Sequence, residues 1–236
     1  MTNCQPLYTP VRSKPMHVAV FGSGSGTVLE ALIEGQDLYS IQAIVTDRHC
    51  RCIDIGEQNS IPTIYHSYKK HAGSKVSFEK KILNSLKAFD IDIIFLAGYM
   101  RLVQAPLLTA FPNRILNVHP ADLTIRDEKG HRKYVGIDAL TDALKNGETS
   151  TRSTVFIVDK GIDTGKIVTL GPVIPYTQGE PVTDERIERH LELHKPLSDW
   201  VASVQALNLV AEGRVNLNEE GAFICAESSP LLTSNQ

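Results

Sequence analysis

Two apolar stretches, each followed directly by polar residues, decide the fold of this chain of 236 residues. The first reads Asp-Ile-Asp-Ile-Ile-Phe-Leu-Ala-Gly-Tyr-Met-Arg-Leu-Val over residues 90–103, and the second reads Arg-Ile-Leu-Asn-Val-His-Pro-Ala-Asp over residues 114–122. Their apolar parts, residues 91–97 and 114–118, are typical of buried strands in a parallel sheet. Ligands of open α/β sheets bind beyond the carboxyl ends of such strands. We therefore expect a site where these two strands end, at Gly98 and His119.

The same alternation of strand, loop and helix continues on the amino-terminal side. Short apolar runs predict further strands over residues 17–21, 41–46 and 62–65. Helical spacing of apolar residues predicts helices over residues 27–34, 50–59, 76–89 and 107–111. This pattern predicts an α/β fold with a doubly wound, mostly parallel central sheet and helices on both faces.

The character of the sequence changes after His119. Residues 121–133 are polar and predict a loop, residues 137–145 a helix, and residues 153–158 and 166–174 two strands that flank a turn. A long helical region over residues 183–210, interrupted by Pro196, precedes a last strand at 215–217. We expect an irregular N-terminal arm (1–15), a single domain (16–217) and a C-terminal tail (218–236).

Composition and charge narrow the class of partner. A formal net charge of −3 gives no basic footprint for nucleic acid. No apolar run approaches the roughly 18 residues that a membrane span requires, and we find no signal peptide. Cys50 and Cys52 form a C-x-C pair without a second Cys or His pair nearby, so we expect no metal site. These features favour a cytoplasmic protein that binds small molecules.

A glycine-rich turn lies between the first predicted strand and helix. It reads Gly22, Ser23, Gly24, Ser25 and Gly26. Backbone N–H groups of such a turn can approach an anion, and the helix N-terminus adds a partial positive charge. The turn matches neither the dinucleotide fingerprint nor a P-loop. It is therefore either a phosphate site or a tight structural turn.

Asn117 and His119 lie two residues apart in an extended segment, so both side chains point to the same side. An amide and an imidazole together can donate hydrogen bonds to a developing oxyanion, as acyl transfer requires. Pro120 fixes the backbone just after them. The alternative is a histidine at a strand end that bonds a local carbonyl.

Asp163 lies in an Ile-Asp-Thr-Gly turn after the strand at 153–158. A carboxylate close to a histidine would orient the imidazole, raise its pKa and position a water. The alternative is a turn aspartate that bonds its own backbone. Residues 129–133, which include four basic side chains, are most simply a solvated loop.

Taken together, these segments resemble the phosphoribosylglycinamide formyltransferases and the broader family of folate-dependent formyltransferases. The resemblance covers residues 16 to about 217. Its most specific parts are Leu-Ala-Gly-Tyr-Met-Arg-Leu (96–102) and Arg-Ile-Leu-Asn-Val-His-Pro (114–120), followed by Tyr-Val-Gly (134–136), Ala-Leu-Lys-Asn-Gly (143–147) and Val-Asp-Lys-Gly-Ile-Asp-Thr-Gly (158–165).

The resemblance implies a role for each matching residue. The family's catalytic Asn, His and Asp fall on Asn117, His119 and Asp163, with Asp163 holding the histidine charged. 10-Formyltetrahydrofolate, the co-substrate, would contact Met100, Arg101, Leu102, Val103, Asp159 and Ile162. The phosphorylated amine substrate, glycinamide ribonucleotide, would contact residues 22–26 together with Gly98, Pro120 and Glu192. The family's mechanism requires no metal. A homodimer is a further expectation.

Departures from the family pattern gather on the side of the amine acceptor. Thr27 stands where the family has an Asn that helps bind the phosphate, and Phe156 stands where it has a second active-site His. Several residues are inserted before Tyr134. Two alternatives follow: a formyltetrahydrofolate hydrolase, which uses a similar Asn-His-Asp set with water as acceptor, and a formyltransferase acting on a different phosphorylated amine.

Overall fold

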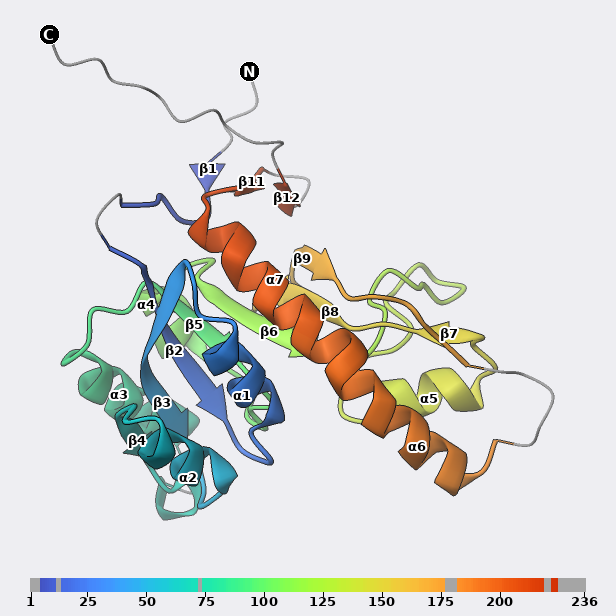
Figure 1. Ribbon diagram of the computed structural model, residues 1–236, viewed down its shortest axis with the longest axis horizontal. Helices are drawn as coiled ribbons and strands as arrows, with labels where there is room; N and C mark the ends of the chain where they lie inside the picture. Colours follow the sequence, from blue (N-terminus) through green and yellow to red (C-terminus); the bar gives the residue numbers. More distant parts are fainter. Residues whose placement is uncertain (1–4, 12–13, 72–73, 177–181, 219–221, 225–236) are drawn as a thin grey trace, which may run out of the picture.

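A seven-stranded sheet forms the centre of the protein (Figure 1). The computed structural model describes residues 5–11, 14–71, 74–176, 182–218 and 222–224. The strand order is β4-β3-β2-β5-β6-β8-β9. The five strands from β4 to β6 are parallel, whereas β8 runs antiparallel to both β6 and β9. The predicted mostly parallel α/β sheet is therefore confirmed.

The parallel strands lie where the apolar runs predicted them. They are β2 (Met16–Gly22), β3 (Tyr39–Thr46), β4 (Thr63–Tyr65), β5 (Ile93–Leu96) and β6 (Ile115–His119). All four residues of β5 are buried, because helices cover both faces of the sheet at its centre. The strands β2, β5 and β6 all end at the same edge of the sheet, as parallel strands must.

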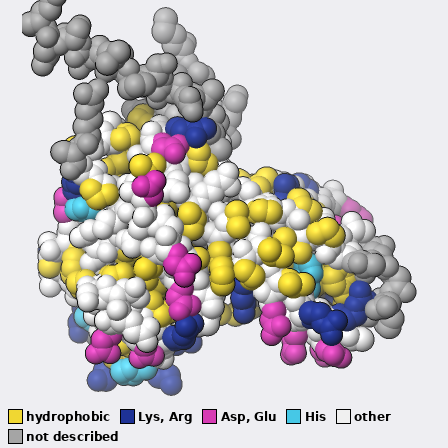
Figure 2. Space-filling model, viewed as in Figure 1, with side chains coloured by type: hydrophobic (Ala, Val, Ile, Leu, Met, Phe, Trp, Pro, Cys, Tyr) yellow, Lys and Arg dark blue, Asp and Glu magenta, His cyan; other side chains and the backbone are white. Residues whose placement is uncertain are grey.

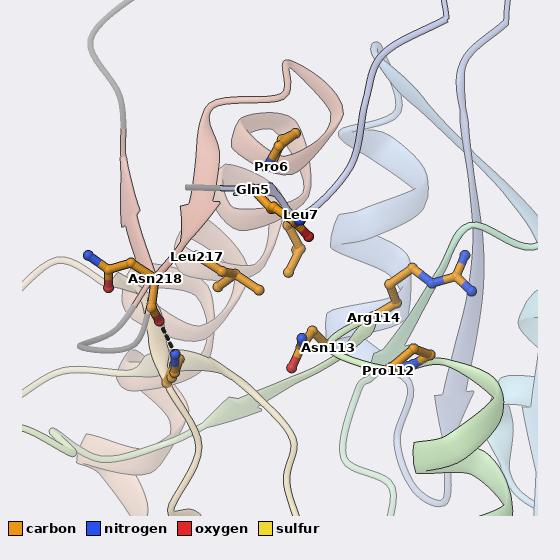
Figure 3. Close-up of a pocket in the computed structure, with 9 residues that line it drawn as sticks. Gln5, Pro6, Leu7, Pro112, Asn113, Arg114, Leu217 and Asn218 are labelled. Carbon is orange, nitrogen blue, oxygen red and sulfur yellow. Dashed lines mark hydrogen bonds between the residues drawn. The ribbon is translucent and has the colours of Figure 1, made fainter. Parts of the chain in front are cut away.

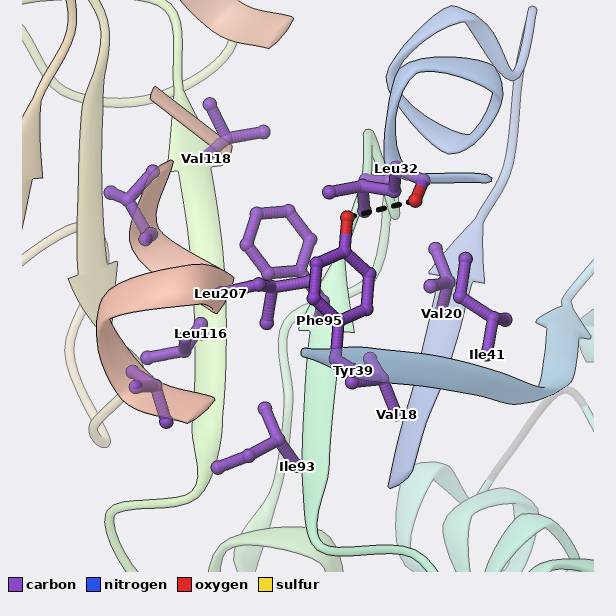
Figure 4. Packing of buried hydrophobic residues seen from close by; sticks show 14 of the residues in the cluster. Val18, Val20, Leu32, Tyr39, Ile41, Ile93, Phe95, Leu116, Val118 and Leu207 are labelled. Atoms are coloured by element: carbon purple, nitrogen blue, oxygen red, sulfur yellow. Dashed lines mark hydrogen bonds between the residues drawn. The ribbon is translucent and has the colours of Figure 1, made fainter. Parts of the chain in front are cut away.

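Helices cover the sheet on two sides. The α-helices of the described residues are α1 (Thr27–Glu34), α2 (Arg51–Gln58), α3 (Lys75–Leu86), α4 (Ala105–Ala110), α5 (Ala139–Lys145), α6 (Asp184–His194) and α7 (Trp200–Ala211). Of these, α5 and α6 pack against each other in a smaller cluster. One core lies between the sheet and α1 and α7, where Tyr39 donates to the carbonyl of Leu32 at 2.8 Å (Figure 4). A second core lies under α3 and α4 and is built around Phe78 and Ile82.

The predicted pair of strands after residue 150 is present as β8 (Thr154–Ile157) and β9 (Ile167–Leu170). The helical region at 183–210 is also present, but its two α-helices are joined by a π-helical turn, Lys195–Asp199. This turn contains Pro196, whose missing N–H interrupts the α-helical ladder. The rod formed by α6 and α7 crosses one side of the molecule in Figure 1.

Four short strands and a 3₁₀ helix were not predicted from the sequence. They are β1 (Gln5–Pro6), β7 (Ser150–Thr151), β10 (Ile174–Pro175), β12 (Ala222–Ile224) and the 3₁₀ helix Tyr68–His71. The arm expected to be irregular thus contains β1, which pairs with β11 (Val215–Leu217). The expected tail contains β12, also paired with β11. Residues 1–4, 12–13, 219–221 and 225–236 of the arm and tail lie outside the described residues, and the domain boundaries stay predictions.

Candidate active site

His119 is the last residue of β6 and is buried, with 3% of its surface exposed. Its Nε2 lies 2.9 Å from the carbonyl oxygen of Tyr134. A carbonyl only accepts hydrogen bonds, so this contact assigns the proton of a neutral imidazole to Nε2. The other ring nitrogen, Nδ1, is then an acceptor and faces Asp163.

Asp163 approaches His119 from the turn between β8 and β9. Its Oδ2 lies 3.5 Å from Nδ1 of His119 and accepts a hydrogen bond from the backbone N–H of Gly136 at 2.7 Å. Asp163 itself has a φ of 52°, in the left-handed region that few residues other than glycine adopt. The structure therefore brings the predicted histidine and aspartate together, and strained backbone of this kind is common at functional sites.

The charge state of His119 differs from the expectation. Burial lowers the pKa of His119 below its ordinary value, and this effect outweighs the attraction of Asp163 and the carbonyl of Tyr134. The cation of Arg132 lowers the pKa of His119 further. We expected Asp163 to hold the histidine charged. Because burial holds the pKa of His119 below its ordinary value, the free protein favours the neutral imidazole near pH 7.

Asn117 lies two residues before His119 on β6 and is half-buried. Its neighbours across the sheet are Leu96 on β5 and Phe156 on β8. The buried ring of Phe156 thus lies directly beside the amide of Asn117. Phe156 is the residue that stands where the family pattern has a second active-site histidine. The alternation of side chains along β6 places Asn117 and His119 on one face of the sheet, as predicted.

The glycine loop at residues 22–26 joins β2 to α1. A Cβ on Gly22 would lie 2.7 Å from Sγ of Cys52, and a Cβ on Gly26 would lie 2.4 Å from Cδ1 of Ile55. These two glycines are therefore required by the close approach of α2. Nothing lies within 4 Å of the corresponding position on Gly24, so the middle of the loop is open.

Ser23 connects the glycine loop to the loop after β5. Its Oγ accepts a hydrogen bond from the N–H of Met100 at 3.0 Å, and its own N–H donates to the carbonyl of Gly98 at 3.3 Å. Gly98 has a φ of 69°, a conformation that favours glycine. The predicted phosphate loop and the predicted folate loop are thus neighbours.

Arg101 is held by Asp47, a residue that the sequence did not single out. Its Nε donates to Oδ2 of Asp47 at 2.6 Å, and its guanidinium lies 4.1 Å from the ring centroid of Tyr68. Burial alone would raise the pKa of Asp47, but hydrogen bonds from Arg48, Ser23 and Arg101 hold it below the ordinary value. The buried carboxylate is therefore ionised and joins both loops.

Residues 99–102 of the loop line a cavity of about 170 Å³ together with Glu79. Met100 and Leu102 are about half exposed, whereas Val103 is buried. Glu79 is a buried carboxylate that accepts hydrogen bonds from the N–H of Gln104 at 2.6 Å and of Leu107 at 3.2 Å. It therefore caps α4, the helix that directly follows this loop.

The remaining predicted contacts are spread over three segments. Asp159 accepts a hydrogen bond from the hydroxyl of Thr164 at 2.6 Å and shapes the turn that carries the exposed Ile162. Pro120 follows His119 directly and is half-buried. Glu192 is exposed on α6, where the buried side chains are Ile187, His190 and His194. Among the described residues, no group of three or more His, Cys, Asp and Glu side chains is placed to hold a metal ion.

A separate pocket of about 490 Å³ lies at the opposite end of the sheet (Figure 3). It is lined by Arg114, just before β6 begins, and by Leu7 and Leu217 among others. Its two cations are engaged: Arg114 donates to the carbonyls of Asp92 and Ala110, and Lys166 donates to that of Asn218. The candidate catalytic groups, Asn117, His119 and Asp163, therefore lie in the other site, at the carboxyl ends of the parallel strands.

Comparisons with known proteins identify the family of this chain. Residues 16–188 match the model of the formyl transferase family. Phosphoribosylglycinamide formyltransferase of Bacillus subtilis (strain 168) is 32% identical over 191 residues, which cover 79% of this chain and 91% of that protein. The trifunctional purine biosynthetic protein adenosine-3 of Homo sapiens is 33% identical over 215 residues, or 88% of this chain. This chain spans only 20% of that trifunctional relative.

Solved structures share the fold. Glycinamide ribonucleotide transformylase 1 from Symbiobacterium toebii superimposes with a TM-score of 0.78 at 29% identity, covering 91% of this chain and 96% of that one. A formyltetrahydrofolate deformylase from Pseudomonas syringae pv. tomato superimposes with a TM-score of 0.75 at 16% identity, over 90% of this chain and 66% of that one, and shows the common fold alone. Since the family model matches most of the chain and the Bacillus relative aligns over nearly its whole length, this chain belongs to the formyl transferase family, as the resemblance predicted.

Proposed function

We propose that this protein transfers a formyl group from 10-formyltetrahydrofolate to the amine of glycinamide ribonucleotide, a step of purine biosynthesis. The observation that carries the proposal is the contact between Nδ1 of His119 and Asp163, 3.5 Å apart at the carboxyl end of β6. The glycine loop and the loop 98–103 are joined through Ser23. They follow β2 and β5, and β5 pairs with both β2 and β6 in the sheet. The names of the formyltransferase relatives support the choice of substrates.

In the proposed mechanism, Nδ1 of His119 acts as the base. It takes a proton from the amine as the amine nitrogen bonds to the formyl carbon. Asn117 donates to the oxyanion that forms, and preorganised donors of this kind contribute strongly to acyl transfer. The resulting imidazolium is paired with Asp163 and stabilises the oxyanion through its positive charge. It returns the proton to N10 as the bond between N10 and the formyl carbon breaks and tetrahydrofolate leaves.

The two substrates bind to the glycine loop and to the loop 98–103. The folate lies against Met100, Arg101, Leu102 and Val103, with Asp159 and Ile162 on the opposite loop. The phosphate of the amine lies on residues 22–26, where Gly24 leaves open space. Gly98, Pro120 and Glu192 complete the predicted acceptor side.

A second candidate acceptor is favoured by one observation. The buried Phe156 adjoins Asn117, so the acceptor side presents an apolar ring at that point. A phosphorylated amine other than glycinamide ribonucleotide would fit this change, and hydrolysis with water as acceptor is the third reading.

A steady-state assay with purified 10-formyltetrahydrofolate and glycinamide ribonucleotide tests the proposal. Formylated ribonucleotide and tetrahydrofolate should appear in equal amounts. Loss of the formyl group at the same rate without the amine would instead indicate a hydrolase. Absence of any turnover would refute the proposed reaction.

A thermal-shift comparison separates the two substrates. Both a folate analogue and glycinamide ribonucleotide should raise the melting temperature, because a ligand that binds only the folded state stabilises it. A shift with the folate analogue but none with glycinamide ribonucleotide would favour a different amine.

Assembly and location stay predictions. Leu193, Leu197 and Val201 are each between 44% and 50% exposed at four-residue spacing along α6, the π-helical turn and α7, where Figure 2 shows apolar side chains gathered. A homodimer is one way to cover these side chains, and sedimentation velocity measures whether the protein dimerises.

None of the described helices has the length and apolar character needed to cross a membrane. A cytoplasmic location, binding of small molecules only and a metal-free reaction remain expected.

A further inference from the structure

The segment inserted before Tyr134 is a small hairpin rather than the solvated loop expected from its charges. Arg126 and Arg132 form an antiparallel bridge. The N–H of Asp127 donates to the carbonyl of His131 at 2.8 Å, and the N–H of Lys133 donates to that of Ile125 at 3.0 Å. The hairpin leads directly into Tyr134, whose carbonyl accepts from His119.

Arg132 differs from the other basic residues of this hairpin. Arg126 and Lys129 are exposed, whereas Arg132 is half-buried and reaches the turn that carries Asp163. One guanidinium nitrogen donates to the carbonyl of Asp163, and the other donates to the carbonyl of Gly165 at 2.6 Å. The planar fork of arginine suits such a two-point contact, which lysine cannot reproduce.

The two carbonyls belong to Asp163, the residue with the strained backbone, and to Gly165, two residues after it. Asp163 has a φ of 52°, and such conformations persist only where the surroundings fix them. Arg132 holds the backbone of this turn while the N–H of Gly136 holds the carboxylate of Asp163. Residues 132–136 therefore bind this turn at two places, its backbone through Arg132 and the carboxylate of Asp163 through the N–H of Gly136.

We propose that Arg132 is a positioning residue, which fixes the turn of Asp163 so that its carboxylate faces Nδ1 of His119. The role assigned to the His119–Asp163 pair rests on the proposed function. The hairpin then serves the catalytic pair through Arg132 alone, the one of its arginines that reaches the turn of Asp163.

The charges around His119 give a readout that is independent of activity. Asp163 and Asp199 raise the pKa of His119, whereas burial and the cation of Arg132 lower it. Removing Arg132 takes away its repulsion of the imidazolium. If Arg132 acts only through its charge, its removal should raise the pKa of His119. If Arg132 positions Asp163, its removal also weakens the attraction of Asp163, which is the larger of the two charge effects, and the pKa of His119 should fall.

Three variants test the proposal: Arg132→Ala, Arg132→Lys and the exposed control Arg126→Ala. Arg132→Ala should lower kcat for formyl transfer by about 10²-fold, because a misplaced catalytic group costs about this much, with little change in KM. Added guanidinium ion should restore part of the rate. Arg132→Lys should fall between the wild type and Arg132→Ala, and Arg126→Ala should match the wild type.

The outcomes are distinguishable. A wild-type kcat in Arg132→Ala would overturn the proposal. An equal loss in Arg126→Ala, or a loss without guanidinium rescue in a variant that keeps the melting temperature, would also overturn it. NMR titration should give His119 a lower pKa in Arg132→Ala than in Arg126→Ala, because Asp163 has moved away, and a raised or unchanged pKa would refute positioning. If the wild type transfers no formyl group, the proposed function fails, and the NMR comparison still decides the role of Arg132.

Discussion

At the scale of single residues, His119 is the group on which the proposed chemistry depends. Replacing His119 with Ala removes the base and one partner of the oxyanion, so we expect kcat to fall by about 10²–10³-fold. Steady-state kinetics measures this change. Leu102→Ala, which alters an exposed side chain of the folate loop, should raise the KM for the folate instead. An unchanged kcat in the His119 variant would show that another group carries the proton.

The lowered pKa of His119 sets the pH dependence of the reaction. A base must be neutral, so kcat/KM should be level near pH 7 and fall with decreasing pH only below the ordinary histidine pKa of about 6.5. Asp163→Asn removes an attraction that raises this pKa and should move the acid limb to still lower pH. A limb that moves to higher pH would contradict the assignment of Nδ1 as the base.

At the scale of elements, α4 depends on one acid from α3. Glu79→Ala would leave the N–H groups of Gln104 and Leu107 without their acceptor in a buried place, which should cost about 1–3 kcal/mol of unfolding free energy. Lys80→Ala, one residue further along α3 and exposed, is the control. Chemical denaturation of both variants measures the difference. Equal stability would mean that other groups satisfy the start of α4.

Asp47 joins the glycine loop to the folate loop. Its carboxylate binds Arg101 at 2.6 Å and interacts with Ser23, whose hydroxyl accepts from Met100. Asp47→Asn keeps the shape but removes the charge, and should weaken binding of a folate analogue by about tenfold, or 1.4 kcal/mol. Calorimetric titration measures the affinity. Asp54→Asn, on α2, offers a control, and equal affinities in the two variants would argue against the coupling.

At the scale of the whole molecule, the sequence predicted the central sheet because buried parallel strands need continuous apolar runs. It missed β1, β7 and β12, since two or three residues show no periodicity. The pairing of His119 with Asp163 followed from family resemblance alone, because the two residues are far apart in the chain. Contacts made by backbone atoms, such as the carbonyl of Tyr134 and the N–H of Gly136, carry no side-chain signal. The sequence predicted that Arg132 is solvated, because it lies among other basic residues in the segment 129–133.

The hairpin at residues 125–133 lies outside the seven-stranded sheet, while β6 is bonded on both edges. Proteins open locally in separate units, and those with few buried contacts open first. Amide hydrogens of the hairpin should therefore exchange with deuterium faster than those of β5 and β6. Low concentrations of urea should abolish catalysis before the far-ultraviolet circular dichroism changes, because opening the hairpin releases Arg132, Tyr134 and Gly136 together. Coincident loss of both signals would show that hairpin and sheet form one cooperative unit.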